Sequence, residues 1–358
     1  MTKKTAAPIK GRGALSNPNN RFQLTRTEPF HDGWAITEET EAPPETTILR
    51  EYVKTIISRN ASPDIGFDQS VNPYRGCEHG CIYCYARPAH AYWDMSPGLD
   101  FETRIVIKEN AAELLQEKLS KPGYVVKPIC IGANTDPYQP LEANLKITRS
   151  IIEVLAEFRH PFSVITKSHL ITRDLDLLAP LAEKRLCSVA VSVTTLDSGL
   201  KRILEPKTPT GLKRLGAIKA LTDAGIMVTM MAAPMIPYIN DHELEAILKA
   251  GRTAGAADAR YILIRLPLEV SEMFQDWLQV HFPDRAAKVM SVIRQCRSGK
   301  NYRSAFGERM VGTGEFARLL HQRWRTTHRQ LGFTDISADR YDLDRSQFMR
   351  HQPQMSLF

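Results

Sequence analysis

Short apolar runs alternate with segments of helical period from about residue 68 to residue 267. Runs rich in β-branched residues predict six strands, at 70–76, 125–133, 162–167, 187–194, 226–233 and 260–266. Between them, apolar residues three and four positions apart predict helices at 110–119, 143–158, 171–184, 210–224 and 242–254. Strands that alternate with helices are typical of right-handed βαβ units around a parallel sheet. The pattern predicts an α/β fold, an incomplete parallel (β/α)6 barrel open enough to admit a large substrate.

The segments on either side of this pattern differ from it. Residues 1–64 lack periodicity and predict an irregular N-terminal arm, so the barrel is expected to span 65–270. Residues 271–335 predict a basic, helical C-terminal extension, and residues 336–358 are a polar tail that ends in QMSLF. The last helix of the extension, expected over 313–332, has an apolar face and a second face that carries Arg318, Arg325 and Arg329.

The net charge of +7 is distributed unevenly along the chain. Residues 3–26 carry six basic residues and no acidic ones, whereas residues 28–45 carry six acidic residues and no Lys or Arg. From Arg285 to Arg329 there are eleven basic residues against two acidic ones. A segment this basic indicates a polyanionic partner, above all a nucleic acid, and a solvated charged face is the alternative.

Two classes of location are disfavoured by the apolar pattern. No apolar run reaches the roughly 18 residues that a membrane helix needs, and the first residues lack the apolar segment of a secretory signal. We therefore expect a cytoplasmic protein with no membrane partner. In a reducing compartment, clustered cysteines indicate metal or redox chemistry rather than disulfides.

Three of the six cysteines, Cys77, Cys81 and Cys84, fall within the eight residues CEHGCIYC, directly after the first predicted strand. Structural zinc would need a fourth ligand, and His79 and His90 are the nearby candidates. Three thiolates also suit an iron–sulfur cluster, which four cysteines normally hold. The remaining cysteines, Cys130, Cys187 and Cys296, lie far away in sequence and are typical of buried core positions.

The C-x3-C-x2-C spacing, with an aromatic residue before the third cysteine, resembles the radical S-adenosylmethionine (SAM) superfamily. The resemblance implies that Cys77, Cys81 and Cys84 bind three irons of a 4Fe-4S cluster, and that SAM chelates the fourth. It also implies reductive cleavage of SAM to a 5′-deoxyadenosyl radical, with the electron coming from a donor such as flavodoxin or ferredoxin. Four further segments resemble the spore photoproduct lyase-like group, which is related to DNA repair. They are GANTDPYQPLE, VITKSH, SVTTLDSGLKRILEPKTPTGLKRL and AGIMVTMMAAPMIPYIND.

This resemblance assigns further roles to single residues. Lys167 and Ser192 would contact the carboxylate of SAM, because a cation and a hydroxyl suit that anion. The ribose hydroxyls would face Thr135 and Asp136, and the adenine would be bordered by Tyr83 and the backbone near Ala233. These residues follow successive predicted strands, whose carboxyl ends meet at one edge of a parallel barrel.

The chain departs from the lyase pattern at the hydrogen donor. Where those enzymes have a cysteine three residues before the aspartate, this sequence has Ala133, and Cys130 lies three residues earlier. Tyr85, directly after the last cysteine of the loop, matches a tyrosine of the lyases' hydrogen-transfer relay and is the predicted catalytic residue. Tyr74 and Tyr83 are alternative relay members.

The favoured function is that of a radical SAM enzyme that acts on a nucleic acid, in DNA lesion repair or base modification. A radical SAM enzyme with a peptide, protein or small-metabolite substrate is the first alternative. A non-enzymatic iron–sulfur protein that binds nucleic acid is the second, although it would have no use for the SAM-contact residues.

The last five residues, Gln354 to Phe358, read QMSLF. This pentapeptide resembles the bacterial sliding-clamp-binding motif, with Met355 in place of a leucine of similar volume. About twenty preceding polar residues would let the peptide reach a clamp while the barrel works nearby. The sequence therefore predicts a sliding clamp as a second partner.

Overall fold

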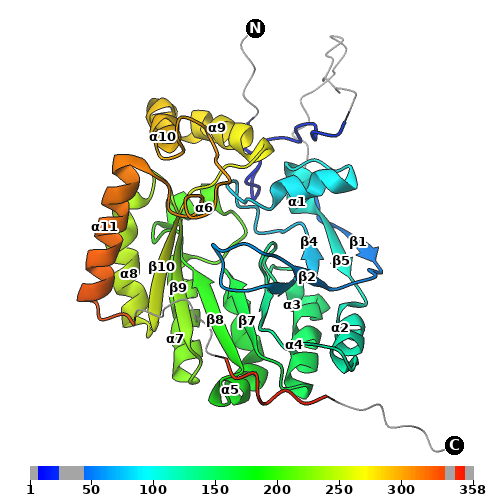
Figure 1. Ribbon diagram of the computed structural model, residues 1–358. Helices are drawn as coiled ribbons and strands as arrows, with labels where there is room; N and C mark the ends of the chain where they lie inside the picture. The colour runs from blue at the N-terminus through cyan, green and yellow to red at the C-terminus, as the bar shows by residue number, and fades with distance from the viewer. Residues whose placement is uncertain (1–6, 24–43, 335–342, 351–358) are drawn as a thin grey trace, which may run out of the picture.

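The computed structural model describes residues 7–23, 44–334 and 343–350 (Figure 1). Its main sheet has the strand order β10-β9-β8-β7-β6-β3-β2. The strands are β2 (Ile57–Arg59), β3 (Gln69–Val71), β6 (Ile129–Ile131), β7 (Phe162–Thr166), β8 (Cys187–Ser192), β9 (Val228–Met235) and β10 (Asp258–Leu263). All neighbouring pairs are parallel except β2 with β3. The predicted α/β fold, a partial parallel barrel, is confirmed.

A smaller sheet, of order β1-β5-β4, stands beside the start of the barrel. Its strands are β1 (Thr47–Glu51), β4 (Tyr74–Arg75) and β5 (Arg104–Lys108). The single strand predicted at 70–76 is therefore two strands in two sheets. Pro73 lies between them and has no backbone N–H to continue a ladder. The chain passes from the main sheet into the small one just before Cys77, so both sheets hold the start of the cysteine loop.

Helices cover the outer face of the main sheet and the carboxyl ends of its strands (Figure 1). The α-helices are α1 (Leu99–Thr103), α2 (Ala111–Ser120), α3 (Glu142–Leu145), α4 (Ile147–Glu157), α5 (Leu175–Glu183), α6 (Ser198–Leu204), α7 (Gly211–Asp223), α8 (Leu244–Thr253), α9 (Glu269–His281), α10 (Pro283–Gln295) and α11 (Gly314–Gln330). Short 3-10 helices are η1 (Arg87–Trp93), η2 (His169–Asp174) and η3 (Asp241–Glu243). The predicted helix at 143–158 is interrupted at Lys146, whose left-handed φ of 52° ends one helix and starts the next.

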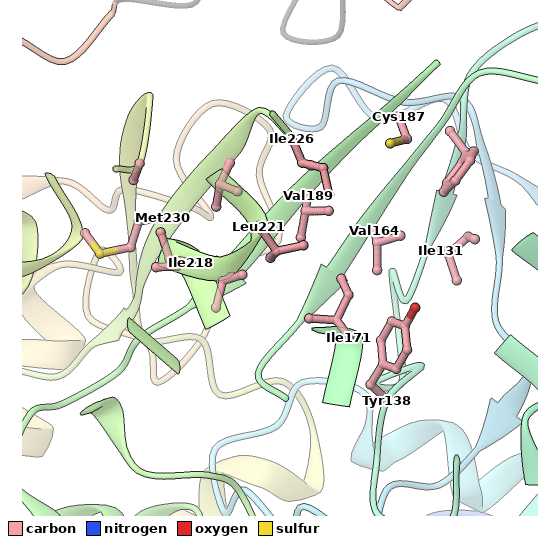
Figure 2. Close-up of a cluster of buried hydrophobic side chains, with 14 of the residues drawn as sticks. Ile131, Tyr138, Val164, Ile171, Cys187, Val189, Ile218, Leu221, Ile226 and Met230 are labelled. Carbon is pink, nitrogen blue, oxygen red and sulfur yellow. The ribbon is translucent and has the colours of Figure 1, made fainter. Parts of the chain in front are cut away.

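The main core lies between the sheet and its outer helices. In Figure 2, Val189 of β8 lies near Leu221 of α7 and near Ile226, and Val164 of the neighbouring strand β7 lies near Ile171. Alternate residues of a strand point to opposite faces of a sheet, so their neighbours in sequence face the inside of the barrel.

The inside of the barrel is lined by small polar residues at one level. Cys130 pairs with Ser70 on one side and with Ser163 on the other, and Ser163 pairs with Ser188. All four are buried, and none belongs to the apolar core against the helices. Cys130, interpreted from sequence as a core cysteine, therefore faces the interior below the cysteine loop.

The C-terminal helices close the barrel at the carboxyl ends of its strands. A second core joins Cys81 and Ile82 to Leu204 of α6, to Leu266 and to Trp277 of α9. Helix α11 packs beside α8 and β10, with Ala317 and Leu320 in the main core (Figure 1). Among the helices of the described residues, none has the length and apolarity to cross a membrane.

Residues 343–350 return to the opposite edge of the barrel, at the amino ends of β7 and β8. The amide of Met349 donates to the Phe158 carbonyl (2.9 Å), and the amide of Asp344 donates to the Arg185 carbonyl (2.9 Å). The ring of Phe348 stacks near that of Phe158, with centroids 6.2 Å apart. This part of the predicted polar tail is therefore fixed to the body of the protein.

Candidate active site

The cysteine loop lies between β4 and η1, at the carboxyl ends of the barrel strands. Cys77 and Cys81 are buried and Cys84 is half-buried, and all three are free thiols. The loop is tied down by its backbone: the Cys77 amide donates to the Phe101 carbonyl (2.9 Å), and the Ile82 amide to the Leu204 carbonyl (3.2 Å). Its position is thus fixed by α1 and α6 together.

The thiols do not converge as the ligands of a single ion would. Within the described residues, no group of three or more His, Cys, Asp and Glu side chains is arranged to hold one metal ion. Both candidate zinc histidines are engaged elsewhere: His79 Nδ1 lies 3.3 Å from Asp136 Oδ2, and His90 Nε2 lies 3.1 Å from the Arg104 carbonyl. A cluster spreads its thiolates over different irons, so this arrangement fits a cluster better than zinc.

The surroundings of the loop raise the pKa values of two of its thiols. Burial, reinforced by Asp136, raises the pKa of Cys77 well above its ordinary value. Burial and then the charge of Glu205 raise the pKa of Cys81 to about 12. Metal binding requires the thiolate form, so binding of iron would displace these protons.

The cysteine loop is supported by a fully buried ion pair between Arg87 and Glu102. The Arg87 guanidinium also donates to the carbonyls of Cys81 (2.9 Å) and Gly80 (3.1 Å). Further bonds run from Arg87 to the carbonyls of Pro97 (3.1 Å) and Gly98 (2.9 Å). One side chain therefore binds the backbone of the cysteine loop and of the turn before α1.

The N-terminal arm completes this arrangement. Glu102 accepts hydrogen bonds from the amides of Gly13 (3.0 Å) and Ala14 (2.8 Å). The contact is so close that a Cβ added to Gly13 would lie 1.9 Å from the Gly80 carbonyl oxygen. Only glycine leaves room for this approach. We call Arg87, Glu102 and the Gly13–Ala14 backbone the arm latch.

Asp136 joins the cysteine loop to the ends of two barrel strands. Its carboxylate accepts from the Thr166 hydroxyl (2.7 Å), the Lys167 amide (2.7 Å) and the Tyr138 amide (2.9 Å), and lies 3.3 Å from His79 Nδ1. Burial alone would raise the pKa of Asp136, but His79 and these donors lower it to about 2. The carboxylate therefore stays ionised and holds His79 beside the strand ends.

A second buried network surrounds Lys167. Glu205 accepts hydrogen bonds from Tyr83, from Thr194 (2.7 Å) and from Arg214. Burial would raise the pKa of Glu205, yet the charges of Arg214 and Lys167 lower it to about 2. Burial would lower the pKa of Lys167, yet the charges of Cys81 and Glu205 raise it. The site therefore keeps a charged ammonium near the thiols.

The other residues expected to contact SAM lie around this network. Lys167 Nζ is 5.9 Å from the centre of the Tyr83 ring. The Ser192 carbonyl accepts from Arg214 (3.0 Å), and the Ala233 carbonyl accepts from Thr194 (3.0 Å). The Thr135 hydroxyl donates to the Tyr74 carbonyl (2.8 Å). The structure thus brings these residues to one end of the barrel, and their contacts with SAM stay predictions.

Tyr85 lies at this end of the barrel and is partly exposed. Its side chain is 42% exposed, its hydroxyl donates to the Ala133 carbonyl, and the Arg265 guanidinium lies 4.3 Å from its ring centre. Tyr74, an alternative relay member, instead donates to buried Glu142 behind the small sheet.

Sequence reasoning did not identify Arg87, Glu102, Glu205 or Arg214. Arg87 lies in the segment after the cysteine loop, and Glu102 lies in the short helix α1, whose apolar pattern is too brief to predict. Glu205 and Arg214 stand within the segment that resembles the lyase-like group, which is the signal that could have drawn attention to them. A charged residue in that segment is otherwise typical of a helix surface.

Fold and site together describe a partial parallel barrel with three free thiols at the carboxyl ends of its strands. A family model described as the radical SAM superfamily matches residues 71–250. An uncharacterized protein of Mycobacterium tuberculosis is 37% identical over 231 residues, which cover 64% of this chain and 68% of that protein. One of Methanocaldococcus jannaschii is 31% identical over 216 residues, covering 60% of this chain and 76% of the relative.

The chain belongs to the radical SAM superfamily. Among solved structures, spore photoproduct lyase in complex with dinucleoside spore photoproduct matches with a TM-score of 0.56 and 14% identity, over 80% of this chain and 79% of the lyase. At that identity the match shows the shared fold. The 4Fe-4S cluster and SAM are the cofactors of the superfamily, and when bound they supply one-electron radical chemistry. The loop thiols could hold the cluster, and Lys167 could hold an anionic group beside it.

Glu102 tests the arm latch. Glu102→Gln keeps the shape of the side chain but leaves the buried Arg87 charge unpaired, so we expect unfolding to become easier by about 3–5 kcal/mol. Urea denaturation of the anaerobic protein measures this change. Glu113→Gln on the exposed face of α2 is the matched control and should shift stability by less than about 0.5 kcal/mol. Equal effects at the two sites would contradict the latch.

Proposed function

We propose that this radical SAM enzyme acts on a nucleic acid, in DNA lesion repair or base modification. The observation that carries the proposal is a row of exposed arginines along α11, formed by Arg318, Arg325 and Arg329. Positions seven and four residues apart share one helix face, and at 1.5 Å per residue the row is about 16 Å long. A row of that length can contact several phosphates of a nucleic acid.

These arginines are not neutralised by strong ion pairs. Arg318 has Glu315 at 3.9 Å, but both side chains are largely exposed, and such pairs contribute little. Within the described residues, Arg325 and Arg329 have no acidic partner. Their positive charge is therefore available to an external anion.

A hollow of about 570 Å³ lies beside the row, between β10 and the second half of α11. Its lining combines cationic and aromatic side chains, namely Arg260, His321, Trp324, Arg325, His328, Arg329 and Phe333. Phosphates and bases are the groups that such a mixture suits. The hollow supports a nucleic-acid interface on this side of the protein.

In the proposed reaction, Cys77, Cys81 and Cys84 ligate the cluster, and Lys167 with Ser192 binds the carboxylate of SAM. The charges of Cys81 and Glu205 raise the pKa of Lys167, so its ammonium stays charged. Tyr85 is the proposed hydrogen-transfer residue, because it directly follows the last cysteine of the loop and is partly exposed. Cys130 lies deeper inside the barrel, so we do not propose it as the hydrogen donor that a cysteine provides in the lyases.

The cluster assignment is tested by iron content. Anaerobically reconstituted wild-type protein should bind about four irons, and Cys77→Ala, Cys81→Ala and Cys84→Ala should each lose the cluster and 5′-deoxyadenosine formation. Tyr85→Phe removes only a hydroxyl next to the same loop and is the matched control. It should keep its iron and cleave SAM while forming less product.

The experiment uses dithionite, SAM and either UV-irradiated or undamaged DNA, with mass spectrometry of the product nucleosides. Full iron content and SAM cleavage in any of the three cysteine variants would refute the ligand assignment. Cleavage of SAM without any altered nucleoside in either DNA would point instead to a peptide or metabolite substrate.

The arginine row is tested by the salt dependence of binding. Each phosphate contact with duplex DNA contributes about −0.9 to the slope of log affinity against log salt. The triple variant Arg318→Ala, Arg325→Ala, Arg329→Ala should therefore flatten the slope by about 2.7 if all three contact phosphates. SAM cleavage should be unchanged, since α11 lies outside the cysteine loop. An unaltered slope would show that the three arginines do not contact phosphates and form a solvated charged face.

Two protein partners are part of the proposal. Radical SAM enzymes need an electron donor, and flavodoxin or ferredoxin is the kind of donor we propose. The second partner is a bacterial sliding clamp, bound through Gln354–Phe358, which lies outside the described residues. Residues 343–350, which precede that peptide, are packed at the amino ends of the strands, at the edge opposite the cysteine loop.

The clamp proposal is tested with a fluorescent peptide of residues 346–358. We expect binding to a bacterial clamp with a dissociation constant of roughly micromolar order, since a short segment must become ordered on binding. Leu357→Ala and Phe358→Ala peptides should bind much more weakly, because aliphatic and aromatic anchors supply most of the energy in such contacts. Equal binding by all three peptides, or none by the native one, would remove the clamp as a partner.

A further inference from the structure

Cations lie over exposed aromatic rings at several places on the surface, and most of these cations are neutralised by a carboxylate. Arg21 lies over Phe22 and Tyr92, but Glu269 is 3.0 Å away. Arg75 over Trp93 is paired with Glu51 at 2.9 Å. In the same way, Arg309 over Phe306 is paired with Asp64 at 2.5 Å. These three arrangements are electrically balanced within the protein.

Two further pairs are not balanced. Arg265 lies 4.3 Å from the ring centre of Tyr85, and the Lys288 ammonium lies 4.2 Å from that of Tyr238. Within the residues that the structure describes, neither cation has an acidic partner. The rings are 42% and 38% exposed. Both pairs therefore offer an external ligand a positive charge next to a flat ring.

Both pairs lie at the carboxyl end of the barrel. Tyr238 follows β9 and Arg265 follows β10, and these strands are adjacent and parallel. Tyr85 follows the cysteine loop, and Lys288 comes from α10. The Tyr238 ring is also 6.4 Å, centre to centre, from that of Phe316 at the start of α11. We define the mouth rim as the four residues Tyr85, Tyr238, Arg265 and Lys288. The rim extends from the cysteine loop to the helix that carries the arginine row.

Leu268 adds an unusual apolar side chain next to the rim. It is 60% exposed and has φ 49° and ψ −128°, a conformation that usually belongs to glycine. Backbone strain of this kind is concentrated at functional sites. An exposed leucine can pack against the face of a base that has lost its neighbour.

We infer that the mouth rim binds unpaired nucleotides, so that the substrate is a single-stranded or locally opened stretch of nucleic acid. This rests on the proposed function. Lys288 and Arg265 are placed to contact phosphates, and Tyr238 is placed to stack on a base. Base faces are available to such rings only outside the duplex stack. Chemistry on a base also requires that it leave the stack.

The test compares a fluorescein-labelled 12-mer of thymidine nucleotides with a labelled duplex, using anisotropy across a range of salt. Wild type should bind the single strand more tightly than the duplex. Tyr238→Leu should weaken single-strand binding about tenfold through lost stacking, and Tyr238→Phe, which keeps the ring, should restore it. Lys288→Gln with Arg265→Gln should flatten the single-strand slope by about 1.4, from about 0.7 per contact.

Arg21→Gln is the matched control, because it removes a cation over exposed rings that is already neutralised by Glu269. It should leave both affinities within about twofold of wild type. Iron content and circular dichroism verify that each variant is folded. Nucleic-acid binding that is unaffected by the rim variants, or a preference for duplex, would overturn the rim while leaving the proposed function intact. No binding to either probe would overturn the proposed function, and the rim with it.

Discussion

The ion pair of Arg87 and Glu102 is buried completely, and the cysteine loop is built around it. Removing two charges from water is costly unless every remaining donor and acceptor is satisfied. Here the guanidinium is occupied by backbone carbonyls of the loop, and the carboxylate by amides of the arm. Each segment thereby supplies what the charges need, and neither can leave without exposing them.

Two further carboxylates satisfy donors in the same way on the barrel side. Asp136 gathers the ends of β6 and β7 around His79, while Glu205 gathers Tyr83, Thr194 and Arg214 below Lys167. The three carboxylates approach the cysteine loop from different elements, and those of Glu102 and Glu205 are fully buried. Preorganised charges of this kind hold a site in one geometry before its cofactor binds.

The sequence predicted the barrel well because its strands and helices are encoded locally, by period and by length. The cysteine loop was also predictable, since its three thiols lie within eight residues. The predicted strand at 70–76 is too long, because Pro73 divides it into two strands. The predicted helix at 143–158 is too long, because Lys146 adopts a left-handed conformation and divides it into two helices. The arm latch was missed because its partners are 88 and 89 residues apart, and two of its donors are backbone amides that no side-chain pattern reveals.

That long separation along the sequence also affects the order in which the chain folds. Closing a loop of 89 residues has a large entropic cost, which is recovered only after the barrel has ordered Glu102. Contacts so distant in sequence tend to form late in folding. The arm therefore docks on a barrel that is already folded, and its amides then satisfy the buried carboxylate of Glu102.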